Sequence, residues 1–175
     1  KVNNQLTLGA TYHTKTSMSD LETDNAKVSM SVLMDVDPTA AQNLQAVPMQ
    51  LVGDIKVKDF QWPATMALGM SYQANDKLMI AADLKRINWS DVMADFTMVF
   101  TASQDASNNL GPGMDMRGAD MTAVMYQDWE DQNVVQLGAS YMVTNATTVR
   151  AGYNYASNPI PDDKLNYLFP AITES

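Results

Sequence analysis

The segment Leu8-Gly9-Ala10-Thr11-Tyr12 carries a pattern that returns at Leu68-Gly69-Met70-Ser71-Tyr72 and at Leu137-Gly138-Ala139-Ser140-Tyr141. In each copy an apolar side chain alternates with glycine, serine or threonine, which is the period of a β-strand. One face of such a strand is apolar and ends in tyrosine, whereas the other face is small and polar. Because glycine packs poorly in a soluble core, the pattern favours a strand whose apolar face meets lipid and whose polar face lines a lumen.

Composition narrows the class of protein. The chain has 175 residues, no cysteine, and 20 acidic residues against 11 lysines and arginines, for a net charge of −9. Without cysteine there is no disulfide framework and no thiolate site. The acidic surplus argues against a nucleic-acid partner, because phosphate binding requires clustered basic residues. No segment reaches the roughly 18 apolar residues typical of a transmembrane helix.

The same alternation predicts five strands, at about residues 5–17, 54–73, 78–100, 133–143 and 147–156. A change of parity near Asp59, close to Pro63, predicts a β-bulge in the second strand. Short turns alternate with long loops at about 20–53, 102–130 and 158–175, and the first loop includes a predicted short helix at 39–44. Short turns at one end and long loops at the other are typical of outer-membrane barrels. A soluble β-sandwich is the alternative.

Several strings together resemble one known family. Residues 78–90 end in Asn88-Trp89-Ser90, and Val135–Tyr141 is followed by Thr148–Tyr153 and by a proline-rich loop. This combination resembles the FadL/TodX family of outer-membrane transporters for hydrophobic compounds. The residues that match the family motifs are Asn88, Trp89, Ser90, Asn158, Pro159, Pro161, Asp162 and Pro170.

The resemblance implies an all-β, antiparallel, up-and-down transmembrane β-barrel in the outer membrane of a Gram-negative bacterium. It implies that this chain is a fragment, about five consecutive strands in the later half of a fourteen-stranded barrel. The first residues show neither an initiator methionine nor a signal peptide, which fits a piece of a longer protein. The partners would then be the plug and the missing strands of the same barrel, together with outer-membrane lipid and lipopolysaccharide.

Polar residues with lumen parity are the candidate substrate contacts. They are Thr11, His13, Asp83, Lys85, Gln136, Gly138, Arg150, Gly152 and Asn154. A charge on the lipid side would cost about 2–4 kcal/mol at the midplane, which favours placing the charged members inside. Arg150 or Lys85 could hold a substrate carboxylate. The stronger expectation is an internal ion-pair network with Asp83, because buried ionisable groups are usually paired.

Catalytic and metal chemistry find little support in the sequence. His13 is the only histidine, and no Gly-x-Ser-x-Gly nucleophile elbow is present. The acidic residues of the 102–130 loop lack the regular spacing of a calcium loop, so we expect a solvated acidic loop, bridged by divalent ions to lipopolysaccharide phosphates. The sequence therefore predicts no enzyme activity, no cofactor and no resident metal.

Fourteen methionines are a further compositional feature, and several lie in the two internal loops. Flexible thioether chains form adaptable apolar surfaces, although methionine also simply replaces leucine or isoleucine. The predicted function is passive uptake of hydrophobic small molecules, either long-chain fatty acids or hydrocarbons, aromatic ones included. The alternatives are a structural or adhesive surface barrel, a porin for hydrophilic solutes, and a barrel enzyme such as a lipase.

Overall fold

The computed structural model describes residues 1–35 and 44–165, with side chains at 34 and 35 excepted. The strands form two antiparallel sheets, and the chain divides into two compact units. One unit comprises Lys1–Met18, Gln61–Asp95 and Tyr126–Ser175; the other comprises Ser19–Phe60 and Phe96–Met125. Within the described ranges the only helices are single 3₁₀ turns, and none of them is long and apolar enough to cross a membrane.

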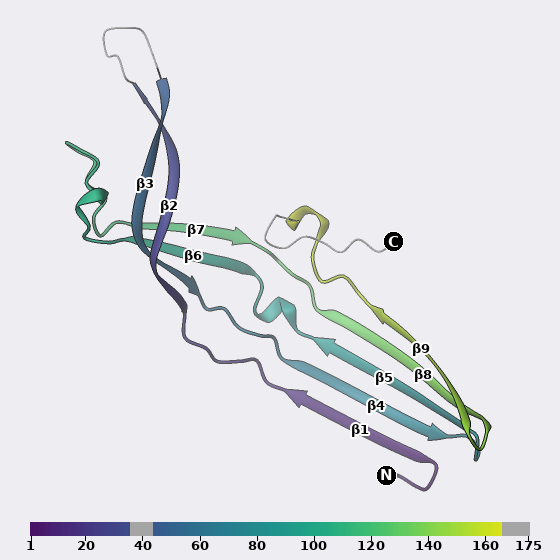
Figure 1. Ribbon diagram of the computed structural model, residues 1–175. Helices are drawn as coiled ribbons and strands as arrows, with labels where there is room; N and C mark the ends of the chain where they lie inside the picture. Colours follow the sequence, from purple (N-terminus) through teal and green to yellow (C-terminus); the bar gives the residue numbers. More distant parts are fainter. Residues whose placement is uncertain (36–43, 166–175) are drawn as a thin grey trace. The chain divides into compact units, whose positions relative to one another are not determined.

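The first unit is built on a five-stranded sheet (Figure 1). Its strands, in spatial order, are β1 (Leu6–His13), β4 (Thr65–Gln73), β5 (Leu78–Ile87), β8 (Gln132–Thr144) and β9 (Thr147–Ala156). The β4–β5 turn is short because the Asn75 side chain organises it: its Oδ1 accepts hydrogen bonds from the backbone N–H groups of Lys77, at 2.9 Å, and Leu78, at 3.0 Å.

The register of this sheet separates two faces. Apolar residues pair across strands, as in Leu68 with Leu84 and Leu137 with Tyr153, while glycine faces glycine in the pair Gly138 and Gly152. The predicted alternation is therefore confirmed in the five barrel-type strands. The apolar face is not covered by the described chain, since Leu68 is 58% and Tyr153 63% exposed. A contiguous exposed apolar surface of this kind marks contact with lipid or with another protein.

The second unit is built on a four-stranded sheet with the order β2 (Leu21–Asp35), β3 (Leu44–Lys58), β6 (Asp95–Ala102) and β7 (Asp120–Tyr126). It contains a small core of Leu51, Phe100 and Ala102. Gly53 makes this core possible, because a Cβ at that position would collide with the carbonyl oxygen of Thr101 and with the Phe100 ring. Absence of the side chain lets the ring lie directly against β3.

A loop from Ser103 to Gly118 closes over one end of this core, and Asn108 holds it there. Asn108 lies in the 3₁₀ turn η2 (Ala106–Asn108) and is fully buried. Its Oδ1 accepts from the N–H of Val52 at 2.9 Å, and its Nδ2 donates to the carbonyl of Val52 at 2.7 Å and to that of Ser103 at 2.8 Å. The side chain thus takes the place of a neighbouring strand: it gives the Val52 N–H its acceptor and adds a second donor to the Val52 carbonyl, which also accepts from the Ser103 N–H at 2.9 Å.

The internal loops differ from the sequence prediction. Much of the predicted 20–53 loop forms β2 and the first part of β3, and the predicted 102–130 loop contains β7. In β2, valine and methionine alternate with serine, as in Val28, Ser29 and Met30, and the strand pairs antiparallel with β3, the next strand in the chain. Of the predicted helix at 39–44, only Leu44 is described, and it begins β3.

The two longest predicted strands are each interrupted. The predicted strand at 54–73 is divided between β3 and β4, and the one at 78–100 is divided between β5 and β6. The first interruption includes Asp59, whose φ is +50°, and ends beyond Pro63, so the parity change reflects a break in the strand rather than a bulge. The second begins with Asn88 and the 3₁₀ turn η1 (Trp89–Asp91).

Candidate functional site

The small, polar face of the five-stranded sheet is the first candidate surface. One cross-strand row consists of Gly9, Gly69, Asp83, Gln136 and Asn154, each paired with the next. The neighbouring row consists of Thr7, Ser71, Ala81, Gly138 and Gly152. The two rows contain no aromatic or branched aliphatic side chain, so this face is a smooth wall of glycine, hydroxyl and amide groups with one carboxylate.

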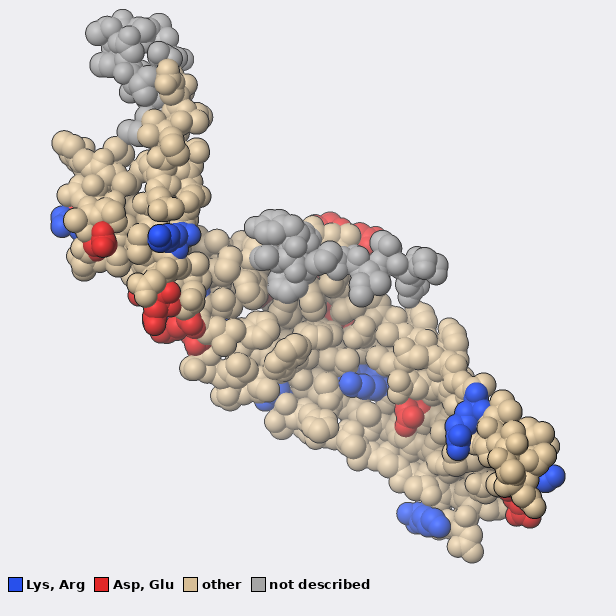
Figure 2. Space-filling view, in the orientation of Figure 1, with Lys and Arg blue, Asp and Glu red and all other residues tan. Residues whose placement is uncertain are grey.

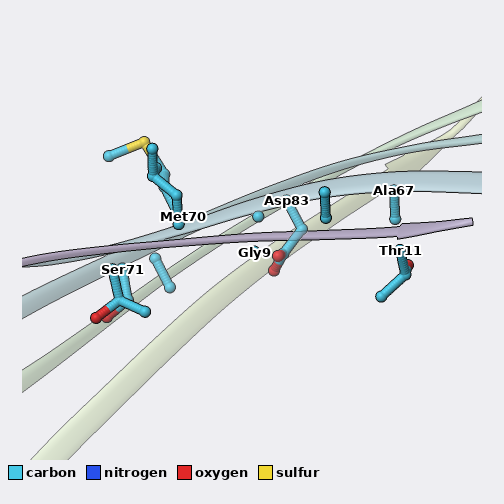
Figure 3. A pocket seen from close by; sticks show the side chains of 11 residues that line it. Gly9, Thr11, Ala67, Met70, Ser71 and Asp83 are labelled. Atoms are coloured by element: carbon cyan, nitrogen blue, oxygen red, sulfur yellow. The ribbon is translucent and has the colours of Figure 1, made fainter. Parts of the chain in front are cut away.

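A shallow hollow of about 420 Å³ lies over the first strands of this wall. Figure 3 shows Asp83, Ser71 and Thr11 on the side of the sheet opposite to Met70. The Asp83 carboxylate lies over Gly69, because a Cβ added to Gly69 would overlap Asp83 Oδ1, while the space beside Gly9 is open. Glycine at these positions therefore creates the room that the hollow and the carboxylate occupy.

The predicted ion-pair network on this face is wrong. Asp83, Lys85 and Arg150 take part in no ion pair within the described part of the chain. The register explains this: Asp83 is opposite Gly69 and Gln136, whereas Arg150 is opposite Ser140, which in turn is opposite Met79. Charged side chains are widely spaced over the five-stranded sheet on the face shown in Figure 2.

The other predicted contacts lie on the same face but at different positions along the strands. Thr11 and Lys85 are both paired with Ala67, one strand to each side of it. His13 is opposite Thr65 at the end of β1. The structure therefore brings Asp83, Gln136 and Asn154 together in one row and places Gly138 beside Gly152, but it leaves His13 and Arg150 apart from them.

A second cluster forms at the loop end of the same sheet. All three tryptophans of the chain meet there: the ring centroids of Trp62 and Trp89 are 6.2 Å apart, and those of Trp89 and Trp129 are 5.1 Å apart with an interplanar angle of 70°. Edge-to-face contacts of this kind contribute about 0.5–1.5 kcal/mol beyond area burial. Trp129 also donates its backbone N–H to the carbonyl of Met93, which is buried.

Asp131 joins the segments that carry these rings. Its Oδ1 accepts from Ser90 Oγ at 2.7 Å and from Ser90 N at 3.2 Å, and its Oδ2 accepts from Arg86 Nη2 at 2.7 Å. The Ser90 hydroxyl, the Ser90 N–H and Arg86 lower the pKa of Asp131, although burial opposes them. Asp131 directly follows the 102–130 segment, for which the sequence predicts a solvated acidic loop, yet its side chain is only 19% exposed. In the sequence, the only indication of this role is that Asp131 directly precedes a predicted strand.

Two acids of the 102–130 region also have specific partners. Asp115 forms an ion pair with Arg117 at 2.5 Å, and hydrogen bonds from Arg117 lower the pKa of Asp115 to about 2. Asp128, just before the Trp129 segment, pairs with Lys164 at 2.7 Å. Among residues 1–35 and 44–165 no group of three or more histidine or carboxylate side chains is placed to hold a metal ion.

The family-motif residues gather at this loop end. Asn88 donates its N–H to the carbonyl of Ala64, Ser90 binds Asp131, and the carbonyl of Pro159 accepts from the N–H of Glu130 at 2.8 Å. Asn158 Oδ1 accepts from the N–H of Ile160 at 3.1 Å, and the 3₁₀ turn η3 (Asp162–Lys164) follows Pro161. These residues therefore shape the connections. Pro170 lies outside the described residues.

Comparison with known proteins identifies the family. The family model described as "Outer membrane protein transport protein (OMPP1/FadL/TodX)" matches residues 1–172. The chain belongs to the OMPP1/FadL/TodX family. Members of this family are outer-membrane β-barrel proteins of Gram-negative bacteria, so the predicted fold class and location are confirmed. No curated protein sequence matches the chain.

Solved structures of three transport proteins resemble the chain. The toluene transporter TbuX of Ralstonia pickettii is 29% identical over 91% of this chain and 34% of its own, with a TM-score of 0.61. The toluene transporter TodX of Pseudomonas putida is 32% identical over 91% and 34%, with a TM-score of 0.58. The monoaromatic hydrocarbon channel CymD is 27% identical over 90% and 35%, with a TM-score of 0.58. The chain thus spans about a third of the length of these structures.

Proposed function

We propose that the protein to which this chain contributes takes up hydrophobic small molecules across the outer membrane by passive diffusion, with no enzymatic step. Aromatic hydrocarbons are the first candidates, because TbuX, TodX and CymD are described as toluene or monoaromatic hydrocarbon transporters. Long-chain fatty acids are the second candidates. The five-stranded sheet would form part of the barrel wall, with lipid on its apolar face and the passage on its glycine-rich face.

The separation of residue types between the two faces of the five-stranded sheet carries this proposal. Leucine, methionine and tyrosine lie on one face in register across all five strands, and glycine, hydroxyl and amide groups lie on the other. The two central rows of this wall carry no aromatic or branched aliphatic side chain, which would let an apolar solute move along them without a tight binding step. Thr11, His13, Asp83, Lys85, Gln136, Arg150 and Asn154 are the proposed polar contacts along this wall. Binding would come mainly from apolar burial, at about 25 cal/mol per Å².

The proposal is tested by placing bulky side chains on the glycine-rich face, where they would narrow the proposed passage. In the full-length protein, Gly138→Trp and Gly152→Trp place an indole on the glycine-rich face, where a Cβ meets only backbone oxygens at ordinary contact distance, 4.0 and 3.5 Å. Ala139 and Ala151 pair with each other on the opposite face, one residue away, so Ala139→Trp and Ala151→Trp are matched controls. Uptake of radiolabelled toluene and of a long-chain fatty acid is measured in cells with equal surface amounts of each variant.

We expect the glycine variants to slow uptake severalfold and the alanine variants to leave it near the normal rate. Equal uptake by all four variants would contradict a passage along this face. Ion conductance in planar bilayers would favour a porin for hydrophilic solutes. Normal hydrocarbon uptake in a deletion strain, together with lost adhesion, would favour a structural surface barrel.

A further inference from the structure

A small polar hollow lies at the turn end of the five-stranded sheet, where the β4–β5 and β8–β9 turns lie side by side (Figure 1). It has a volume of about 200 Å³ and shares no lining residue with the hollow over Gly69. Register places it on the glycine-rich face, because Arg150 is opposite Ser140 and both are two residues away from the pair of Gly138 and Gly152. The polar residues of its lining are Gln73, Asp76, Lys77, Ser140, Thr148 and Arg150.

The two cations of this hollow, Lys77 and Arg150, extend from backbone that is fixed by hydrogen bonds. The N–H of Lys77 donates to Asn75 Oδ1 and its carbonyl accepts from the N–H of Met142, each at 2.9 Å. Arg150 lies inside β9, in the ladder that this strand forms with β8. The turn therefore determines where both side chains begin, although it makes no use of their charges.

Positive charge exceeds negative charge in this hollow. Neither Lys77 nor Arg150 takes part in an ion pair within residues 1–35 and 44–165. Among the described residues that line the hollow, Asp76 is the only carboxylate, and it balances at most one of the two charges. Ionisable side chains inside a membrane protein are usually paired, and this chain spans about a third of the length of TbuX and TodX. The rest of the protein is therefore the expected source of the missing counter-charge.

The lining suits the carboxylate of a protein side chain. A guanidinium group such as that of Arg150 binds a carboxylate through two parallel hydrogen bonds, and the ammonium group of Lys77 adds a second positive charge. The hydroxyl groups of Ser140 and Thr148 are further donors. The volume lies below the range of about 300–1,000 Å³ that is usual for small-molecule sites, which favours a single side chain over a whole solute.

We propose that Lys77 and Arg150 form a docking site for an aspartate or glutamate side chain from the part of the full-length protein that lies outside this chain. The resulting ion pair attaches that acidic segment to the barrel wall at the turn end of the glycine-rich face. This inference goes beyond the proposed function, because it concerns how parts of the protein are held together and does not depend on which solute passes. It also gives a role to Arg150, which the register keeps apart from Asp83.

Zero-length cross-linking tests the pair directly. The full-length protein in lipid nanodiscs is treated with a water-soluble carbodiimide, which joins a lysine amine to a carboxylate in contact with it, and the linked peptides are identified by mass spectrometry. Lys56 and Glu22, whose charged groups are 2.6 Å apart, are the internal positive control. The variants are Arg150→Gln, Arg150→Lys and Lys85→Gln, the last of which removes a positive charge from the same face outside the hollow.

We expect Lys77 to be joined to an aspartate or glutamate outside this chain, with a severalfold lower yield in Arg150→Gln and an unchanged yield in Lys85→Gln. Arg150→Lys keeps the positive charge and should keep most of the yield, which separates loss of charge from a folding defect. The link in the unaltered protein does not depend on the folding of any variant.

Three results would overturn the docking site. They are a link from Lys77 only to Asp76 or to another carboxylate of this chain, no link from Lys77 while Lys56 and Glu22 are joined, and an unchanged yield in Arg150→Gln. Failure of the link together with slow uptake in Gly138→Trp and Gly152→Trp would leave the proposed function intact. Unchanged uptake in those two variants would contradict the function and leave the docking site intact.

Discussion

The five-stranded and the four-stranded sheets alternate apolar and polar residues with the same period, but they differ in what lies on the polar side. In the first sheet the polar side is mostly glycine, hydroxyl and amide, as in the pairs Gly9 with Gly69 and Gln136 with Asn154. In the second sheet it carries ion pairs such as Lys56 with Glu22, which are typical of a surface in water. Alternation alone therefore predicts a strand, and the residues of the polar side indicate which solvent each face meets.

The apolar sides differ too. The second sheet buries Leu51 and Phe100 under its own loop, whereas Leu68 and Leu84 of the first sheet remain more than half exposed. A soluble sheet of this length would need a covering layer, because large exposed apolar patches drive association. Family membership supplies the explanation, since outer-membrane barrels present such a face to lipid.

The largest effect is expected from a charge on the lipid-facing side. Leu137→Arg, in the middle of β8, should destabilise the folded full-length protein in the bilayer by about 2–4 kcal/mol, because a charge near the midplane loses its hydration. Gln136→Arg, the adjacent residue on the other face, is the control and should change stability much less. Urea titration of the protein in lipid vesicles, followed by tryptophan emission, measures both. Similar losses for the two variants would contradict the assignment of faces.

The second largest effect is expected from loss of the Asn108 side chain in the four-stranded sheet. Asn108→Ala leaves the Val52 N–H without its acceptor, while the Val52 carbonyl keeps its hydrogen bond from the Ser103 N–H at 2.9 Å. A buried donor left without a partner costs about 1–3 kcal/mol. We expect fast amide exchange at Val52 and proteolytic cleavage within the loop from Ser103 to Gly118, with the five-stranded sheet unchanged. Asn109→Ala is the control, because Asn109 makes only a local side-chain contact with the N–H of Gly111. Unchanged protection at Val52 in Asn108→Ala would show that the loop is held by other contacts.

The sequence pattern predicts the strands of the five-stranded sheet better than those of the four-stranded sheet. In the first sheet the alternation predicts a strand where each of its five strands lies, because glycine and tyrosine recur at a fixed offset and Asn75 marks a tight turn. It does not predict where β4 begins or where β5 ends. In the second sheet, β2, the first part of β3 and β7 fall in the predicted loops, whereas the end of β3 and most of β6 fall in predicted strands. Strand β6 pairs with β3 across a long sequence separation, as in Ile55 with Phe100, so no local signal specifies that arrangement.

The candidate site was predictable in position but not in its electrostatics. Parity correctly placed Asp83, Gln136 and Asn154 on one face, yet it could not show that Asp83 and Arg150 are too far apart in register to pair. Asp131 was missed for a related reason. Its partners Arg86 and Ser90 lie more than forty residues earlier in the chain, and only the β5–β8 pairing brings them together.

The smallest effect is expected at Asp131, on the loop side of the first sheet. The Ser90 side chain first, then its N–H and Arg86, lower the pKa of Asp131 below its ordinary value of about 4. The stabilisation is therefore fully present above about pH 4, the unfolded value, and is lost as pH falls through the lower pKa of the folded state. Because Trp89 and Trp129 are held next to this carboxylate, tryptophan emission should stay constant from pH 7 to about 5 and change on further acidification.

Asp131→Asn should remove this acid transition and show altered emission already at pH 7, since an amide accepts from Ser90 but does not pair with Arg86. Asp128→Asn is the matched control: Asp128 has a φ of +46°, which asparagine tolerates, and its pair with Lys164 is more exposed. That control should keep both the emission at pH 7 and the acid transition. An acid transition that survives in Asp131→Asn would mean that another carboxylate positions the tryptophans, and the loop end would then depend on the Asp128–Lys164 side of the cluster.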